Sequence, residues 1–189
     1  ALTGEWVTVS PQRATRPWQG EQMAEVSASS SAYDPECYLC PGNARATGAC
    51  NPDYLGPWAF DNDFPALCDA RAASDEAGSI LVSGGHPELF TAAAVTGRCR
   101  VLCYHPDHRK TLSTLSEDEA LAVVALWIAE VQSLRTKYQW VQLFENRGTA
   151  MGCSNSHPHG QIWAVDSLPN EAVKELTQQE AWFEAHGSV

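Results

Sequence analysis

The chain has 189 residues, 44% of them hydrophobic, which is enough apolar material to build the core of one ordinary domain or of two small ones. It carries 12 lysine and arginine residues against 23 aspartate and glutamate residues, so its formal net charge is −11. A charge this negative argues against binding nucleic acid through phosphate contacts or a membrane through a basic surface, and no apolar run approaches the roughly 18 residues of a membrane span.

The first half of the chain is predicted to be mostly irregular. Apolar and polar residues alternate over residues 6–10, and this alternation predicts a short strand. Residues 21–58 are dense in Pro, Gly, Asn, Asp and Cys, which are typical of loops and turns. Residues 66–98 are rich in Ala, Ser and Gly with weak periodicity, so we interpret them as a further loop or an insertion.

More regular patterns follow. Residues 99–105 are predicted to form a strand. Ser116 is a candidate N-cap, and Glu119 three residues later completes the capping-box pattern that starts a helix. Apolar residues then recur at helical spacing, so we expect an amphipathic helix that continues to about Leu134.

The last third of the chain predicts two strands and a helix. The strands are expected over residues 139–145 and 159–165, and the helix from Pro169 toward His186. Hairpin-like strands together with a long packed helix indicate an α+β domain.

The segment 144–163 (FENRGTAMGCSNSHPHGQIW) concentrates residues suited to phosphoryl chemistry. His157 and His159 stand two residues apart, so on a strand both imidazoles would lie on one face. The Gly- and Ser-rich loop before them offers backbone amides and the Ser154 hydroxyl to phosphate oxygens. One imidazole could then attack phosphorus in line and form a covalent phospho-histidine. The alternative, which a bare H-x-H pattern favours, is a pair of structural histidines.

The chain has seven cysteines, an odd number that cannot pair completely within one chain. No secretory signal is visible, so we expect reduced thiols in a cytoplasm and favour metal ligation over disulfides. Cys37 and Cys40 form a C-x-x-C motif, which could contribute two thiolates to a tetrahedral zinc site. A redox pair or two ordinary thiols are the alternatives for this motif.

Four blocks of sequence together resemble the galactose-1-phosphate uridylyltransferase family, a branch of the histidine-triad superfamily. They are the segment 144–163, residues 10–20 (SPQRATRPWQG), residues 34–63 around the C-x-x-C motif, and residues 100–112 (RVLCYHPDHRKTL). The resemblance implies a histidine-triad-like antiparallel sheet with packed helices. It also implies a role in galactose metabolism, in which UDP-glucose donates UMP to a histidine and galactose-1-phosphate then accepts it.

The resemblance assigns the catalytic roles to two residues. It makes His159 the nucleophile, and it places Gln161 where histidine-triad hydrolases have a third histidine. A glutamine cannot act as a general acid, but it can donate a hydrogen bond to a phosphate oxygen. This substitution therefore suits transfer between sugar phosphates better than hydrolysis.

Two metal sites follow from the same resemblance. A zinc ion is expected to be held by two thiolates and two imidazoles, those of Cys37, Cys40, His108 and His157. His105, three residues before His108, does not match the family position. In some family members a carboxylate that matches Glu175 binds a second, structural metal, either iron or zinc.

The implied substrate contacts form a nucleoside group and a phosphate group. Uracil and ribose are expected to lie against the matched residues Leu39, Asn62, Asp63 and Phe64. The phosphates are expected near Arg13, Arg16, Asn146, Ser154 and Gln161. Without the resemblance, the N-D-F stretch reads as a turn that enters a core phenylalanine, and the two arginines read as solvated surface charges.

Family chains are about twice as long and consist of two related halves. This sequence corresponds to the first half, so residues 1–189 are expected to form an N-terminal domain, either as a fragment or as a half-length relative. The second half normally supplies the histidine partners of the Glu175 metal and much of the hexose site. Family active sites form at a dimer interface, which implies a homodimer. The alternative functions are a relative that acts on ADP-sugars, and a non-catalytic, zinc-containing domain that binds nucleotides.

Overall fold

The computed structural model describes residues 4–10, 13, 31–69, 93–148, 151, 153 and 155–188. Two residues with a predicted role, Arg16 and Ser154, lie outside the described residues, as does much of the segment 66–98. Within the described part, the chain forms a four-stranded antiparallel sheet and two long helices, so the predicted α+β class is confirmed.

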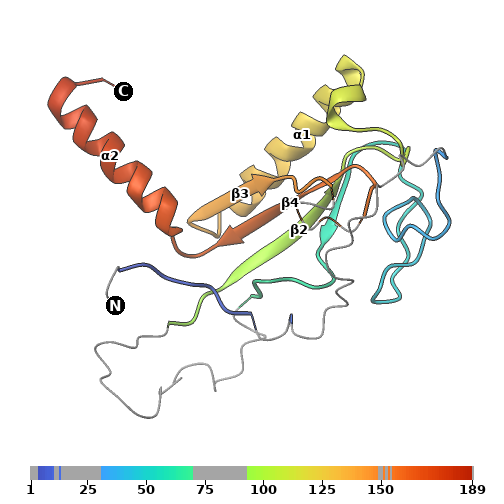
Figure 1. Cartoon of the computed structure of the whole chain (residues 1–189), viewed down its shortest axis with the longest axis horizontal. Coiled ribbons are helices and arrows are strands. Elements are labelled where there is room, and N and C mark those ends of the chain that lie inside the picture. Colours follow the sequence, from blue (N-terminus) through green and yellow to red (C-terminus); the bar gives the residue numbers. More distant parts are fainter. Residues whose placement is uncertain are drawn as a thin grey trace, which may run out of the picture.

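The sheet has the strand order β1-β2-β4-β3, and each neighbouring pair is antiparallel. Its strands are β1 (Trp58–Asp61), β2 (Gly97–Cys103), β3 (Trp140–Phe144) and β4 (His159–Val165). The two central strands, β2 and β4, pair along their whole length, from Gly97 opposite Val165 to Cys103 opposite His159. Figure 1 shows these central strands side by side, with β3 next to β4.

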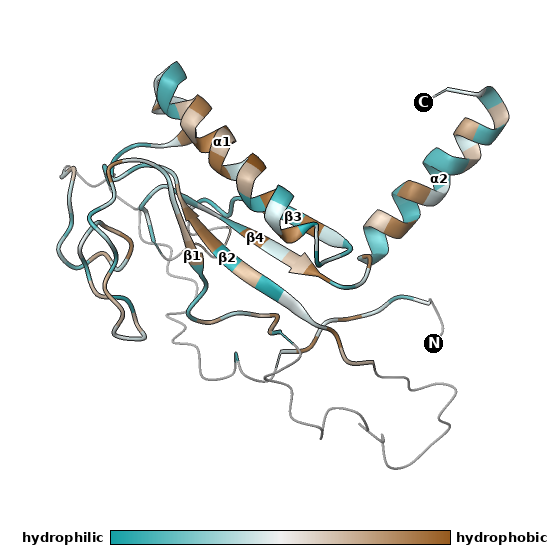
Figure 2. Cartoon of the chain, turned by 180° about the vertical axis from the view of Figure 1, so that it is seen from behind, coloured by the Kyte–Doolittle hydropathy of each residue, from teal (hydrophilic) through white to brown (hydrophobic). Residues whose placement is uncertain are grey.

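Helix α1 (Glu117–Leu134) covers one face of the sheet (Figure 1). It follows a short 3₁₀ helix, η3 (Leu112–Thr114), and starts at the predicted capping box. The Ser116 hydroxyl accepts from the Glu119 N–H, and the Glu119 carboxylate accepts from the Ser116 N–H at 2.7 Å. Figure 2 shows hydrophobic positions along α1 and the strands, and the core between them includes Leu102, Val123, Leu134, Ile162 and Ala164.

The opposite face of the sheet is covered by a loop. Residues 37–54 fold against β1 and β2, and together they bury an apolar cluster that contains Cys37, Leu39, Cys40, Tyr54, Phe60, Val101 and Cys103. The irregular structure predicted for this part of the chain is confirmed as far as residue 57, where β1 follows. The loop has a defined position on the sheet because two of its cysteines belong to the core.

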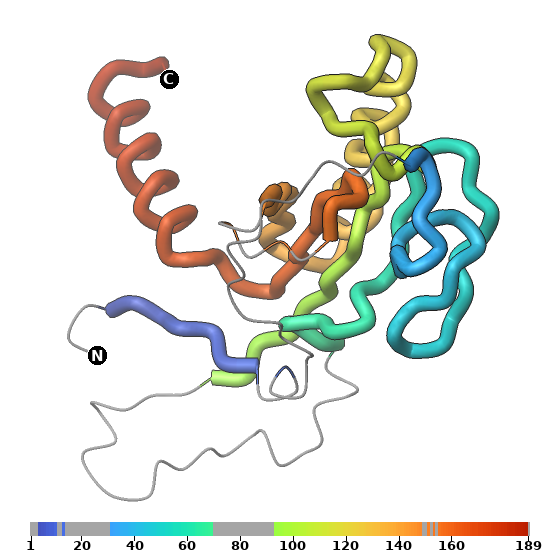
Figure 3. Tube along the Cα trace, turned by 45° about the vertical axis from the view of Figure 1, so that its right-hand side comes forward, coloured from blue at the N-terminus to red at the C-terminus, as the bar shows by residue number. Residues whose placement is uncertain are grey.

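Helix α2 (Asn170–His186) extends away from the sheet, and the N-terminal segment lies near its start (Figures 1 and 3). The Asn170 side chain accepts from the Trp6 N–H at 3.1 Å and donates to the Trp6 carbonyl at 2.9 Å. Lys174 adds an ion pair with Glu5 at 2.9 Å. The prediction of a strand over residues 6–10 is therefore wrong: in the described part of the chain these residues form no strand, and the Trp6 backbone bonds to a side chain of α2.

Two further boundaries differ from the sequence analysis. β2 begins and ends two residues earlier than the predicted strand 99–105, and β1 lies partly within the stretch 21–58 that was predicted to be irregular.

The described helices are also informative about membranes. No helix in the described part of the chain is both long enough and apolar enough to cross one.

Candidate metal centre and active site

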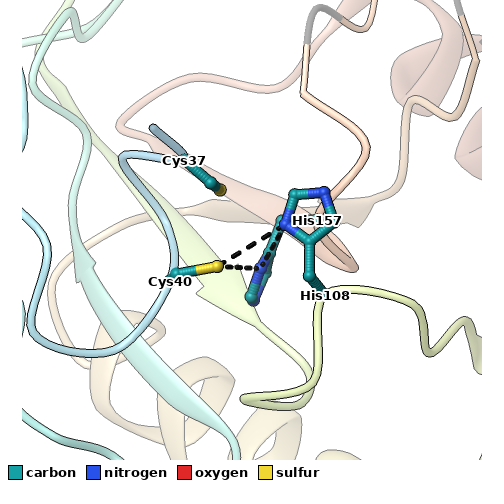
Figure 4. A group of neighbouring side chains, drawn as sticks. All are labelled: Cys37, Cys40, His108 and His157. Carbon is teal, nitrogen blue, oxygen red and sulfur yellow. Dashed lines mark hydrogen bonds between the residues drawn. The ribbon is translucent and has the colours of Figure 1, made fainter. Parts of the chain in front are cut away.

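Two cysteines and two histidines converge beside the loop-covered face of the sheet (Figure 4). Cys37 and Cys40 come from the loop, His108 from the segment that follows β2, and His157 from the segment that leads into β4. Their potential ligand atoms all lie within 4.8 Å of one another, and all four residues are buried. The Nδ1 atoms of the two histidines lie 3.4 Å apart, and each lies 3.5 Å from the Cys40 Sγ. The structure thus brings together the four residues predicted to bind a metal.

Hydrogen bonds hold the C-x-x-C turn in its shape. The Cys40 N–H donates to the Cys37 carbonyl at 3.1 Å, which closes the turn between the two cysteines. The side-chain amide of Asn43 donates to the same Cys37 carbonyl at 2.7 Å, and that of Asn51 donates to the Cys40 carbonyl at 3.0 Å. None of these bonds uses a sulfur atom or an imidazole, so the turn can form without a metal.

A hydroxyl group contacts each histidine on the side away from the cluster. The Ser156 Oγ lies 2.7 Å from Nε2 of His108, and the Tyr54 hydroxyl lies 3.0 Å from Nε2 of His157. In both histidines the outer partner occupies Nε2, so that Nδ1 faces the other potential ligands. Outer contacts of this kind orient imidazole ligands in metal sites.

Asn155 joins two members of the cluster. Its side-chain oxygen accepts from the His157 N–H at 2.8 Å, and its amide donates to the Cys37 Sγ at 3.5 Å. The sequence analysis missed Asn155, Ser156 and Tyr54. The first two precede the H-P-H motif directly and could have been included with it, whereas no local pattern points to Tyr54.

Burial controls the protonation of the potential ligands. Burial and the neighbouring His108 lower the pKa of His157 to about 3, and burial also lowers the pKa of His108. Both imidazoles are therefore neutral at neutral pH, with a lone pair available. Burial raises the pKa of the Cys40 thiol to about 12, so a thiolate here needs a cation beside it. Two thiolates and two neutral imidazoles fit Zn²⁺ in donor type and in charge.

His159 is the first residue of β4, and its two ring nitrogens have different roles. Nδ1 lies 2.7 Å from the backbone carbonyl oxygen of His157. A carbonyl can only accept, so Nδ1 carries the proton and Nε2 carries the lone pair. Burial lowers the pKa of His159, which keeps the ring neutral at neutral pH. The arrangement therefore provides an oriented nitrogen nucleophile.

Gly160 lets β4 pass close to the side chain of Tyr104. A Cβ atom added to Gly160 would lie 2.0 Å from the Tyr104 hydroxyl oxygen and 3.0 Å from the Phe144 carbonyl oxygen, so only glycine fits. Because side chains alternate along a strand, the residues on either side of Gly160 point to the opposite face. His159 and Gln161 thus share the loop-covered face, where the Gln161 Oε1 accepts from the Trp163 indole at 3.4 Å.

The four residues predicted to contact the nucleoside differ in accessibility. Leu39 is only 1% exposed, and its side chain belongs to the core beneath the loop. The Asn62 side chain accepts from the Phe64 N–H at 2.9 Å and shapes a turn directly after β1. The Asp63 carboxylate lies 3.8 Å from the Arg45 guanidinium. The three residues of the N-D-F stretch are partly buried, so their side chains remain partly accessible.

Two residues predicted near the phosphates, Arg13 and Asn146, are described, and both are partly buried. Burial raises the pKa of the Cys99 thiol on β2, and the charge of Arg13 opposes that shift. Glu175 lies exposed on α2. Across the residues that the structure describes, the only group of three or more potential metal ligands is the Cys/His cluster, and Glu175 is not part of it.

His105 does not join the cluster. Its Nε2 lies 3.0 Å from the Glu119 carboxylate, and its Nδ1 accepts from the Asp107 N–H at 2.9 Å. Both ring nitrogens are thus directed to other partners. His108, the residue that the resemblance favours, occupies the position in the cluster.

Comparison with known proteins identifies close relatives over the whole chain. Residues 1–169 match the family model described as galactose-1-phosphate uridyl transferase, N-terminal domain. The galactose-1-phosphate uridylyltransferase of Haemophilus influenzae is 47% identical over 188 residues, which cover 100% of this chain and 52% of that protein. The protein of the same name from Rattus norvegicus is 44% identical, covering 98% of this chain and 47% of its own length. The chain therefore spans about half the length of the curated relatives it matches.

Solved structures show the same fold. A uridylyltransferase mutant matches with a TM-score of 0.69 at 19% sequence identity, over 99% of this chain and 50% of its own. An ADP-glucose phosphorylase from Arabidopsis thaliana with bound ADP-glucose matches with a TM-score of 0.58 at 19% identity, over 94% of this chain and 51% of its own. At these identities the likeness establishes the fold alone.

Proposed function

The chain belongs to the galactose-1-phosphate uridylyltransferase family, and on this premise we propose that residues 1–189 form the N-terminal domain of a nucleotidyltransferase. Its reaction moves UMP from UDP-glucose to galactose-1-phosphate. The names of the bacterial and the rat relatives, 47% and 44% identical to this chain, support the activity. The family match over residues 1–169 supports the position of the domain.

One observation supports the covalent mechanism, the hydrogen bond from Nδ1 of His159 to the His157 carbonyl. In the first half-reaction, the Nε2 lone pair of His159 attacks the phosphorus of UDP-glucose that bears the uridine. An N–P bond forms, the P–O bond to glucose-1-phosphate breaks, and glucose-1-phosphate leaves. In the second, a phosphate oxygen of galactose-1-phosphate attacks the same phosphorus, and the N–P bond breaks. The group that leaves in the first half-reaction and the acceptor in the second are both sugar phosphates, which need little protonation, so the glutamine at position 161 suffices.

The other residues of the proposed site bind and orient the substrate. Gln161 shares the strand face with His159 and donates to a phosphate oxygen, with further phosphate contacts from Arg13, Arg16, Asn146 and Ser154. The turn after β1 holds the nucleoside, with Asn62 toward the pyrimidine edge, Asp63 toward the ribose hydroxyls, and Phe64 and Leu39 as apolar support. Positioning of this kind supplies much of the rate in phosphoryl transfer.

The proposed cofactor is one zinc ion, which would be held by Cys37, Cys40, His108 and His157. When bound, it would act as a structural centre that ties the loop to the strand of the nucleophile. A second structural metal, iron or zinc, would use Glu175, with its remaining ligands from the second half of the family chain. The compartment is proposed to be a reducing cytoplasm, because a zinc site with two cysteine ligands needs reduced thiols. A homodimer is proposed because family active sites form between two subunits.

The decisive experiment is mass spectrometry of the protein after incubation with UDP-glucose. We expect a mass increase of one uridylyl group, located on His159 by peptide mapping and absent from His159→Ala. Tight binding of UDP by calorimetry without any adduct would instead identify a non-catalytic nucleotide-binding domain. An adenylyl adduct formed from ADP-glucose, with none from UDP-glucose, would identify a relative that acts on ADP-sugars.

A further inference from the structure

Tyr54 connects the C-x-x-C loop with a histidine of the cluster through a single hydroxyl group. Its oxygen lies 2.6 Å from the backbone carbonyl oxygen of Leu39, which stands between the two cysteines, and 3.0 Å from Nε2 of His157. The Tyr54 ring is buried and stacks on Trp58, with 5.3 Å between ring centroids. Packing therefore fixes the position of the hydroxyl independently of any metal.

The Tyr54 hydroxyl has a single proton, and the contact in which this proton lies determines the tautomer of His157. The Leu39 carbonyl has no proton, so the single proton of the Tyr54 hydroxyl must lie in the 2.6 Å contact with it. His157 must then donate in the other contact, which places its ring proton on Nε2. The lone pair is left on Nδ1, the atom that lies 3.5 Å from the Cys40 Sγ.

The second histidine lacks an equally strict constraint. Its outer partner, Ser156, has a hydroxyl that can donate or accept, so the 2.7 Å contact with His108 allows either tautomer. The carbonyl of His157 also accepts from His159, so a restraint on His157 extends to the nucleophile. Among the described outer contacts, the Tyr54 hydroxyl is therefore the one that specifies a metal-binding tautomer.

We propose that Tyr54 is a positioning residue that holds His157 as an Nδ1 ligand and so organises the site before the metal binds. This inference rests on the proposed metal centre. Outer partners of imidazole ligands commonly contribute a factor of about 10 to 100 in metal affinity. Because Tyr54 acts through His157, its loss affects the retention of zinc as well as turnover.

The test measures the zinc affinity of Tyr54→Phe by competition with a chromophoric chelator. This variant keeps the ring and all four ligands and removes only the hydroxyl, so zinc should bind about 10- to 100-fold more weakly than to the unmodified protein. Tyr138→Phe is the matched control. Tyr138 is also buried, in the core on the α1 side of the sheet, and its hydroxyl donates to the exposed Asp69 at 2.7 Å, so zinc affinity should not change.

The outcomes distinguish failure of the Tyr54 proposal from failure of the proposed metal centre. Equal zinc affinity of Tyr54→Phe and the unmodified protein would overturn the role of Tyr54 and leave the metal centre standing. Failure of the unmodified protein to bind zinc would overturn both. If Tyr54→Phe does not fold, imidazole nitrogen NMR of the unmodified zinc-bound protein decides. A proton on Nε2 of His157 with zinc at Nδ1 is expected, and the reverse assignment would overturn the proposal.

Discussion

The backbone carbonyl of His157 accepts a hydrogen bond from Nδ1 of His159 across 2.7 Å, while the His157 ring faces Cys40 and His108. One residue thus belongs to the candidate metal cluster through its side chain and orients the candidate nucleophile through its backbone. A change in the metal cluster is therefore expected to displace the nucleophile as well, whereas loss of the nucleophile should leave the cluster unchanged.

This asymmetry predicts different effects of removing each histidine. His159→Ala should abolish covalent uridylylation and keep zinc content and fold, because its ring is not among the potential ligands. His157→Ala should lower both uridylylation and zinc content, because it removes one of the four potential metal ligands and leaves three. Adduct mass, zinc content by elemental analysis and circular dichroism report the three properties. Full zinc occupancy in His157→Ala would contradict the ligand set.

The metal is predicted to stabilise the fold directly. Cys37→Ser should lower zinc content well below about one ion per chain and lower the thermal midpoint by on the order of 5 °C or more, since roughly 2–4 °C corresponds to 1 kcal/mol in a domain of this size. Differential scanning calorimetry and elemental analysis provide the measurements. Cys50→Ser is the control, because Cys50 is exposed and lies outside the cluster. A metal-free protein with the same thermal midpoint as the zinc-bound protein would contradict a structural role for zinc.

The sequence predicts those elements whose signals are long or local. α1 has both a capping box and repeated apolar positions, and β4 and α2 have the predicted bounds. β1 has four residues, too few to show an alternation, and it follows a stretch of turn-forming residues. Residues 6–10 alternate as a strand does, but alternation does not provide a pairing partner, and this backbone bonds to Asn170 instead.

The residues of the candidate site show the same difference between local sequence signals and contacts that depend on the fold. The C-x-x-C and H-P-H motifs are local patterns, whereas their convergence joins residues 117 positions apart in the sequence and depends on the fold. The choice of His108 over His105 came from the family resemblance and agrees with the cluster. Tyr54 lies 103 positions from His157 and has no motif of its own, so its contact is visible only in the structure.

The pH dependence of uridylylation follows from the burial of His159. Burial lowers the pKa of this imidazole below its ordinary value of 6.5, so at that pH the neutral ring still predominates over the protonated one. The single-turnover rate with UDP-glucose should therefore decline as the pH falls, with a midpoint below pH 6.5. Zinc content measured at each pH is the control. A midpoint at or above the ordinary value would contradict the burial argument.

Gly160→Ala should destabilise the protein because the new methyl group meets the Tyr104 hydroxyl at 2.0 Å. Overpacking of a core typically costs about 1–3 kcal/mol, which urea unfolding would detect. The uridylylation rate should fall too, because the neighbouring His159 would shift with the strand. The matched control is Gly56→Ala, where an added Cβ meets no atom within 4 Å. Equal stability of Gly160→Ala and the unmodified protein would show that β4 has more freedom than its packing indicates.

The last prediction concerns the two half-reactions. The proposed nucleophile and the nucleoside contacts lie within this chain, which spans about half the length of its relatives, 52% for the Haemophilus influenzae protein. Uridylylation of His159 should therefore survive at a reduced rate, because a poorly held sugar weakens positioning. Transfer of UMP to galactose-1-phosphate should be lost or nearly lost, because the hexose contacts are expected from the other half. A steady-state assay of UDP-galactose formation tests this, and a protein that contains both halves should restore turnover. Robust turnover by residues 1–189 alone would show that these residues form a complete site, for example between two copies of the chain.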